Sequence, residues 1–195
     1  MTPPLFFFGA MSPYSWFAAE RIGDMLPAAE WRPVFAGGLF ASVGRSSWGL
    51  DDRRAAGLAD CEARAAQHGL GPIVWPQPWP TVDVIVARAT LVAREHGRLQ
   101  PFALAAMRLA FLEGGDLGDP AVVAEAARRA GLDDDLVSVR VQAPEVKGAL
   151  RKVTAEAVAL GVTGVPTEVV GEEHFWGDDR LADAARAAAA AAAAR

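Results

Sequence analysis

The stretch Met11-Ser12-Pro13-Tyr14-Ser15 decides how this chain is expected to fold. It follows an apolar run at residues 5–8, typical of a buried strand, and precedes a segment whose apolar residues recur at helical spacing to about Leu26. Serine followed by proline favours a helix start, because the serine caps the first amides and proline has no amide hydrogen to leave unpaired. The sequence therefore predicts a strand that leads into a helix at Ser12.

The start of this helix is also a place where an anion could bind. Unpaired amides and the helix dipole together attract negative charge to a helix N-terminus. From the local residues alone, the favoured interpretation of Ser12 is a helix cap, which is the common role of such a serine. A working hydroxyl is the alternative.

The composition limits the class of protein. The chain has 195 residues, 52% hydrophobic and 22% charged, which suits a globular protein with one well-buried core. The net charge of −5 gives no electrostatic reason to expect nucleic acid. The single cysteine, Cys61, cannot form an internal disulfide and is interpreted as a small core or surface residue.

Neither a signal peptide nor a membrane span is expected. The N-terminus lacks a basic leader and is interrupted by Pro3 and Pro4. No apolar run approaches the ~20 residues that a span requires. A cytoplasmic protein without membrane contact is the resulting expectation.

Strands are expected at both ends of the chain and helices in its middle. A second strand at residues 30–35 contains Pro33, which favours the edge of a sheet, and an irregular stretch follows from Gly37 to about Gly49. A hairpin at 167–170 and 174–176 precedes a last helix that starts near Asp178. The predicted central helices span residues 51–68, 82–96, 101–112, 120–130, 133–141 and 144–160, with a stiff aromatic loop at 75–80.

This order predicts a discontinuous domain. The β-α-β and β-β-α parts at residues 1–48 and 161–195 together would make one α/β unit. The helical block at 49–160 would then be an insertion into that unit.

Two motifs make the chain resemble a known family. The first is Phe7-Phe8-Gly9-Ala10-Met11-Ser12-Pro13-Tyr14-Ser15, and the second is Gly161-Val162-Thr163-Gly164-Val165-Pro166-Thr167. With Phe175-Trp176-Gly177-Asp178-Asp179-Arg180-Leu181 behind them, they are similar to the 2-hydroxychromene-2-carboxylate isomerases, relatives of DsbA and of kappa-class glutathione transferases. The resemblance implies a thioredoxin-like α/β fold with an inserted all-helical domain, glutathione as cofactor and a homodimer.

The resemblance also gives Ser12 a specific role. Redox members of this superfamily carry Cys-x-x-Cys where this chain has Ser12 and Ser15. Without a thiol there, the site cannot run thiol–disulfide exchange. The resemblance implies instead that the Ser12 hydroxyl donates a hydrogen bond to the thiolate of bound glutathione.

Further site residues follow from the resemblance. It implies a cis Val165-Pro166 bond whose Val165 backbone pairs with glutathione. Asp178 and Asp179 would hold the γ-glutamyl end, and Arg53 stands where the family has a lysine. The remaining expected contacts with cofactor or substrate come from Trp176, Tyr14, Trp79 and Glu168.

Two of these residues keep more than one interpretation. Trp176 is either a core aromatic or a wall of the pocket. Glu168 is either a surface residue on an edge strand or a group that acts on substrate or repels glutathione. No metal is expected, because the three histidines are scattered without ligand spacing and are interpreted as surface residues.

The implied activity is isomerisation of an aromatic pyruvate-like small molecule by reversible addition of the glutathione thiolate. The alternatives are a glutathione transferase or a non-enzymatic module that binds a small molecule or partner. Arg53 and Val82 replace the family's Lys and Asn, which also leaves another thiol as an alternative cofactor.

Overall fold

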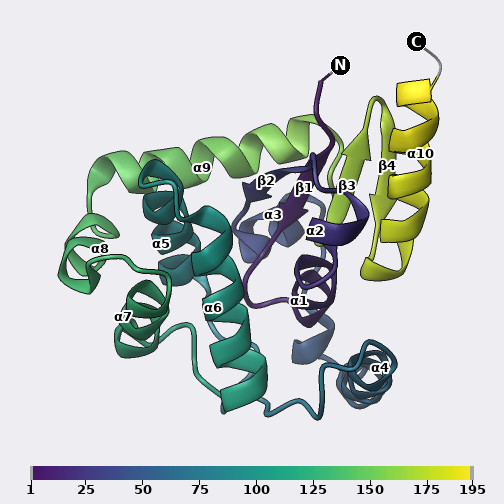
Figure 1. Ribbon diagram of the computed structural model, residues 1–195. Helices are drawn as coiled ribbons and strands as arrows, with labels where there is room; N and C mark the ends of the chain where they lie inside the picture. The colour runs from purple at the N-terminus through teal and green to yellow at the C-terminus, as the bar shows by residue number, and fades with distance from the viewer. Residues whose placement is uncertain (1, 194–195) are drawn as a thin grey trace.

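The computed structural model describes residues 2–193 and contains a four-stranded mixed sheet (Figure 1). The strand order is β2-β1-β3-β4. Strand β1 (Leu5–Phe8) runs parallel to β2 (Glu30–Pro33) and antiparallel to β3 (Thr167–Val170), which pairs with β4 (Glu173–Trp176). Strand β2 lies at the sheet edge, as Pro33 predicted.

Helices surround the sheet. Figure 1 shows α5 to α8 grouped on one side of it and α10 beside β4. The helices are α1 (Pro13–Ala19), α2 (Ile22–Met25), α3 (Ala36–Ser42), η1 (Trp48–Leu50, a 3₁₀ turn), α4 (Arg54–Gln67), α5 (Val84–Glu95), α6 (Leu99–Glu113), α7 (Pro120–Arg129), α8 (Asp134–Arg140), α9 (Pro144–Ala159), η2 (Asp178–Arg180, a 3₁₀ turn) and α10 (Leu181–Ala193). None of the helices among residues 2–193 is long and apolar enough to cross a membrane.

The two faces of β1 bury different cores. Phe6 and Phe8 belong to the core shared with α1, whereas Phe7 packs with Ala157 of α9. Alternate strand residues point to opposite faces, so an apolar run of this kind suits a strand covered on both sides.

The first helix is shorter than predicted. It ends at Ala19, and α2 begins at Ile22, although one helix to about Leu26 was expected. The Arg21 amide bonds to Ala18 O at 3.0 Å, while the Arg21 Nε donates to Phe17 O at 2.8 Å. These contacts tighten the last turn and occupy a carbonyl at the helix end, which closes α1.

The stretch predicted to be irregular after Gly37 contains α3 and η1. Gly37 and Gly38 suggested a loop, but both lie against the ring of Phe35. A Cβ atom at Gly38 would come within 2.8 Å of Phe35 Cδ1. These glycines allow close packing of a helical turn and do not break it.

The core is continuous between the sheet and the central helices. Trp16 of α1 stacks on Phe111 of α6 with ring centroids 5.5 Å apart, and both side chains are fully buried. The division into 1–48 plus 161–195 and an inserted 49–160 stays a prediction.

Candidate active site

Ser12 caps α1 through its side chain. Its Oγ accepts a hydrogen bond from the Ser15 amide at 3.2 Å, and its own amide donates to Gly9 O at 3.0 Å. No acceptor within residues 2–193 takes the Ser12 hydroxyl hydrogen. Because a hydroxyl can accept and donate at once, Ser12 can cap the helix and still donate to a ligand.

Ser15 has a different environment. It is fully buried, and its Oγ accepts from the Gly9 amide at 3.3 Å. The second serine of the pair therefore holds the turn after β1, and only Ser12 is placed to meet a ligand.

Gly9 brings this turn close to Val165. A Cβ atom at Gly9 would lie 3.0 Å from Ala36 Cβ and 3.5 Å from Val165 Cγ2. The Val165-Pro166 peptide bond is cis. Pro166 O accepts from the Gly177 amide at 3.0 Å, whereas the amide and carbonyl of Val165 have no hydrogen bond within residues 2–193.

Trp176, at the end of β4, lies against Gly164, the residue that precedes Val165. Its indole covers Gly164, where an added Cβ would meet Nε1 at 2.5 Å. The Arg45 guanidinium lies 4.6 Å from its ring centroid, and 49% of the residue is exposed. This exposure excludes a core aromatic, and the role of pocket wall stays a prediction.

Asp178 is the centre of a buried ion-pair network. It is 1% exposed, and its carboxylate accepts from Arg64 Nη1 at 2.8 Å and Arg21 Nη2 at 3.2 Å. His68 Nε2 lies 3.3 Å from the same carboxylate, and Arg21 also binds the Asp178 carbonyl at 2.8 Å. The side chain of Asp179 is 60% exposed, so Asp179 is the carboxylate of the pair that solvent reaches.

Arg64 links this network to Tyr14. The Tyr14 hydroxyl donates to Asp60 Oδ2 at 2.8 Å, and Arg64 Nε donates to the same oxygen at 2.9 Å. Burial, together with neighbouring Cys61 and Asp60, raises the pKa of Tyr14 above its usual range. The phenol is therefore protonated at neutral pH, and it donates its hydrogen to Asp60 of α4.

Trp79 fastens the aromatic loop to the Ser12 turn. It is 5% exposed, and its Nε1 donates to Met11 O at 3.4 Å. Trp48 and Trp75 lie against it, with ring centroids 4.8 and 4.7 Å away. The contact explains how a loop from the central helical block can position the residue before Ser12.

Arg53 is directed elsewhere. Its guanidinium binds the carboxylate of Asp51, and this contact lowers the pKa of Asp51 to about 2. Its neighbour Arg54 instead donates to Gly49 O at 3.0 Å and to Trp79 O. No contact joins Arg53 to Ser12, Val165 or Trp176 within the described residues.

Glu168 lies inside the protein. Strand β3 is central in the sheet, which rules out the surface position on an edge strand. The residue is 0% exposed, and neither carboxylate oxygen has a hydrogen-bond partner within residues 2–193. Burial raises the pKa of Glu168 to about 8. The side chain is closed off from solvent, and its contact with substrate stays a prediction.

Arg64 and His68 were missed from the sequence. Arg64 bridges Asp60 and Asp178, and only its i,i+4 spacing from Asp60 signalled a role. His68 was interpreted as a surface residue, but its side chain is only 15% exposed. Cys61, interpreted from the sequence as a core or surface residue, is fully buried, and burial raises the pKa of its thiol to about 12.

Comparison with known proteins places this arrangement in a family. The family model of the DSBA-like thioredoxin domain matches residues 5–189. The chain belongs to this DsbA-like family. A 2-hydroxychromene-2-carboxylate isomerase from Sphingobium xenophagum is 29% identical over 185 residues, covering 90% of this chain and 92% of that protein.

Solved structures agree on the DsbA-like fold. The structure of a 2-hydroxychromene-2-carboxylate isomerase matches with a TM-score of 0.83 at 18% identity, covering 98% of this chain and 96% of the other. A probable DsbA oxidoreductase from Streptomyces coelicolor matches with a TM-score of 0.74 at 22% identity, covering 99% and 91%. The predicted thioredoxin-like fold and the resemblance to the isomerases are confirmed.

Proposed function

We propose that this DsbA-like protein is a glutathione-dependent isomerase of the 2-hydroxychromene-2-carboxylate isomerase type. The relative from Sphingobium xenophagum, an isomerase by name, supports the reaction class. The observation that carries the proposal is Ser12, a hydroxyl with a free hydrogen at the position where redox relatives hold a thiol. Cys61 is buried and cannot replace the missing redox pair.

The residues around Ser12 fit a peptide-like thiol. Glutathione, when bound, supplies a thiolate that adds reversibly to a conjugated carbon, which allows rotation about the former double bond. Ser12 donates a hydrogen bond to that sulfur and lowers its pKa. The backbone of Val165, which has no partner of its own, is suited to pair with the tripeptide as an added strand would.

The dipole of α1 adds little to this effect. The helix has seven residues and is followed by a break, so its aligned peptide groups are few. The hydroxyl of Ser12 therefore contributes most of the thiolate stabilisation. Asp179 is the exposed carboxylate suited to the γ-glutamyl ammonium, and Asp178 positions it through the network behind.

The substrate is an aromatic pyruvate-like small molecule. Trp176 offers an exposed aromatic face beside Val165. Trp79 and Tyr14 hold the residues around Ser12 in place. Trp79 is buried, and Tyr14 is hydrogen-bonded to Asp60. We expect the protein to be cytoplasmic. We also expect a homodimer, which analytical ultracentrifugation of the purified protein would check.

Ser12→Ala is expected to raise the thiol pKa of bound glutathione by about one to two units. A hydrogen bond to a charged group contributes about 1.5–3 kcal/mol, and one pKa unit equals about 1.4 kcal/mol. Turnover of 2-hydroxychromene-2-carboxylate should fall about 10- to 100-fold for the same reason. The thiol pKa is read from the ultraviolet absorbance of the thiolate as pH is raised, with affinity from calorimetric titration.

Ser12→Thr is the matched control, because it keeps both the cap and the hydroxyl and should restore the low thiol pKa. Failure of the wild type to bind glutathione would contradict the cofactor assignment. An unchanged thiol pKa in Ser12→Ala would contradict the role of Ser12. Binding without turnover would favour the alternative, a transferase or a binding module.

A further inference from the structure

A hollow that Ser12 does not line lies between α3, α5 and α9. Its volume is about 460 Å³, within the range of small-molecule sites. Apolar side chains line much of it: Phe35, Val84, Leu150 and Val158. None of the residues assigned to the Ser12 site lines this hollow.

Three cations border the hollow: Arg88, Lys147 and Arg151. No aspartate or glutamate lines it, and these three side chains form no ion pair within residues 2–193. The Nε of Arg88 is buried without a hydrogen-bond partner. In a chain with a net charge of −5, this is a local excess of uncompensated positive charge.

Both hydroxyl groups in the lining make hydrogen bonds within the chain, but only Ser42 uses its hydrogen. Thr154 Oγ1 accepts from the Phe35 amide at 3.2 Å, and the Ser42 hydroxyl donates to Leu39 O at 2.7 Å. Polar recognition in the hollow therefore rests mainly on the cations, and the Thr154 hydroxyl can add one donor. A buried guanidinium nitrogen without a partner is costly, and an anionic group would relieve that cost.

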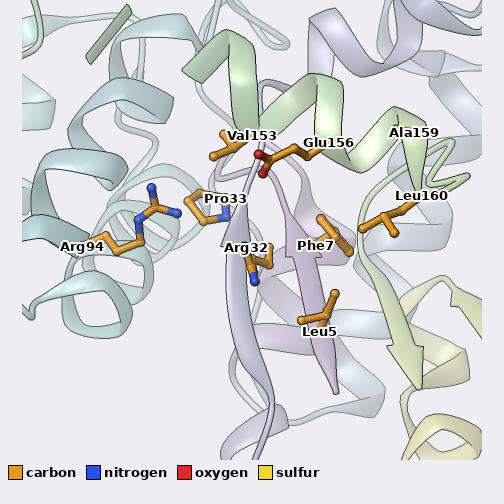
Figure 2. A pocket seen from close by; sticks show the side chains of 9 residues that line it. All are labelled: Leu5, Phe7, Arg32, Pro33, Arg94, Val153, Glu156, Ala159 and Leu160. Atoms are coloured by element: carbon orange, nitrogen blue, oxygen red, sulfur yellow. The ribbon is translucent and has the colours of Figure 1, made fainter. Parts of the chain in front are cut away.

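The hollow on the other side of α9 provides a contrast. It has a volume of about 370 Å³ and is lined by residues of β1, β2, α5 and α9. Figure 2 shows Glu156 projecting from α9 into this hollow, which Arg32 and Arg94 also line. Arg32 pairs with Glu30 at 3.0 Å, and Glu156 belongs to the lining. This hollow therefore contains a carboxylate of the chain, whereas the hollow between α3, α5 and α9 has none in its lining.

We propose that the hollow between α3, α5 and α9 binds an amphipathic carboxylate. The alkyl or aryl part of the ligand contacts the apolar side chains of the lining, such as Leu150. Its carboxylate pairs with Arg88, Lys147 and Arg151. A small anion without an apolar part would leave the apolar side chains of the lining in contact with water, and a neutral apolar molecule would leave the cations unpaired. A ligand that carries both features satisfies the whole lining.

Dodecanoate, below its micelle-forming concentration, is the probe. Calorimetric titration of the 195-residue protein should show saturable binding of dodecanoate, and dodecanol of the same chain length should bind at least tenfold more weakly. Lys147→Glu and Arg151→Glu should each weaken dodecanoate binding about tenfold, because an attraction to the carboxylate becomes a repulsion at a residue of the lining.

Lys152→Glu is the matched control. It makes the same charge change on the same helix, but Lys152 lies outside the lining and its side chain is 78% exposed. Its dissociation constant should stay within about twofold of wild type. Equal weakening by Lys152→Glu, or no saturable binding by the wild type, would overturn the proposal.

Two further measurements separate this site from other roles. Ser12→Ala should bind dodecanoate with the affinity of wild type, because Ser12 does not line the hollow. A failure of the glutathione proposal would therefore not overturn the dodecanoate site. Sedimentation of wild type and Lys147→Glu tests whether a second copy fills the hollow. A wild-type dimer that Lys147→Glu dissociates, with no dodecanoate bound by either protein, would assign the hollow to that interface and refute the ligand.

Discussion

Asp178→Ala should lower the free energy of unfolding by about 3 kcal/mol, because it leaves a buried cationic cluster without its carboxylate. Asp178 is 1% exposed and binds Arg21, Arg64 and His68. The two arginine side chains are 25% and 26% exposed, so water recovers part of the loss. Urea denaturation near neutral pH measures the change.

Asp179→Ala is the matched control for this change. Its side chain is 60% exposed and its one ion pair, to Arg64, is long at 3.8 Å. The free energy of unfolding should stay within about 0.5 kcal/mol of wild type. Glutathione affinity should nevertheless fall, since Asp179 is the exposed carboxylate of the proposed site. Equal stability of Asp178→Ala and wild type would show that the network does not hold the fold.

The network also explains which parts of the fold the sequence could not predict. The break between α1 and α2 depends on Arg21, which is held by Asp178, a residue 157 positions later. No local pattern reports such a contact. By contrast, the bounds of β1 and β3 were predicted correctly, because runs of apolar and β-branched residues between Gly and Pro are local signals.

In the candidate site, too, local features could be predicted from the sequence and contacts between distant segments could not. The cap by Ser12 was predictable from Ser-Pro alone, and the structure has it. The link from Trp79 to Met11 O and the bridge by Arg64 join segments that only the folded chain brings together. Glycines misled the prediction after residue 36, because their role against Phe35 is close packing and not a turn.

Glu168 was the residue whose position the sequence predicted least well, and it carries the largest expected dependence of stability on pH. Both of its oxygens are buried without partners, and the charged groups that influence it are Asp178, Arg21 and Asp179. Burial is the main cause that raises the pKa of Glu168 to about 8 from an ordinary 4.5. A glutamate there is a neutral acid at neutral pH.

The sign of the effect follows from the raised pKa. The folded state holds the proton more tightly than the unfolded chain, so the stabilisation is fully present below about pH 4.5 and is lost as pH rises through about 8. The difference of 8 − 4.5, or 3.5 units, at about 1.4 kcal/mol per unit gives on the order of 5 kcal/mol.

Glu168→Gln should remove this dependence, because glutamine keeps the shape of the neutral acid but cannot ionise. The variant should match wild type at about pH 4 and exceed its free energy of unfolding by several kcal/mol at about pH 9. Urea denaturation at a series of pH values tests the expectation. Glu172→Gln, at an exposed turn residue, is the control and should follow the wild-type curve.

Glu168→Leu separates the proton from the polarity of the buried group. Leucine removes two oxygens that have no partner and adds apolar contact with the core of Phe6 and Phe175, the cross-strand neighbours of Glu168. It should therefore be more stable than wild type even at about pH 4, where Glu168→Gln gains nothing. Wild-type and Glu168→Gln curves that run parallel over the whole pH range would mean that the folded protein supplies the carboxylate with water or a partner.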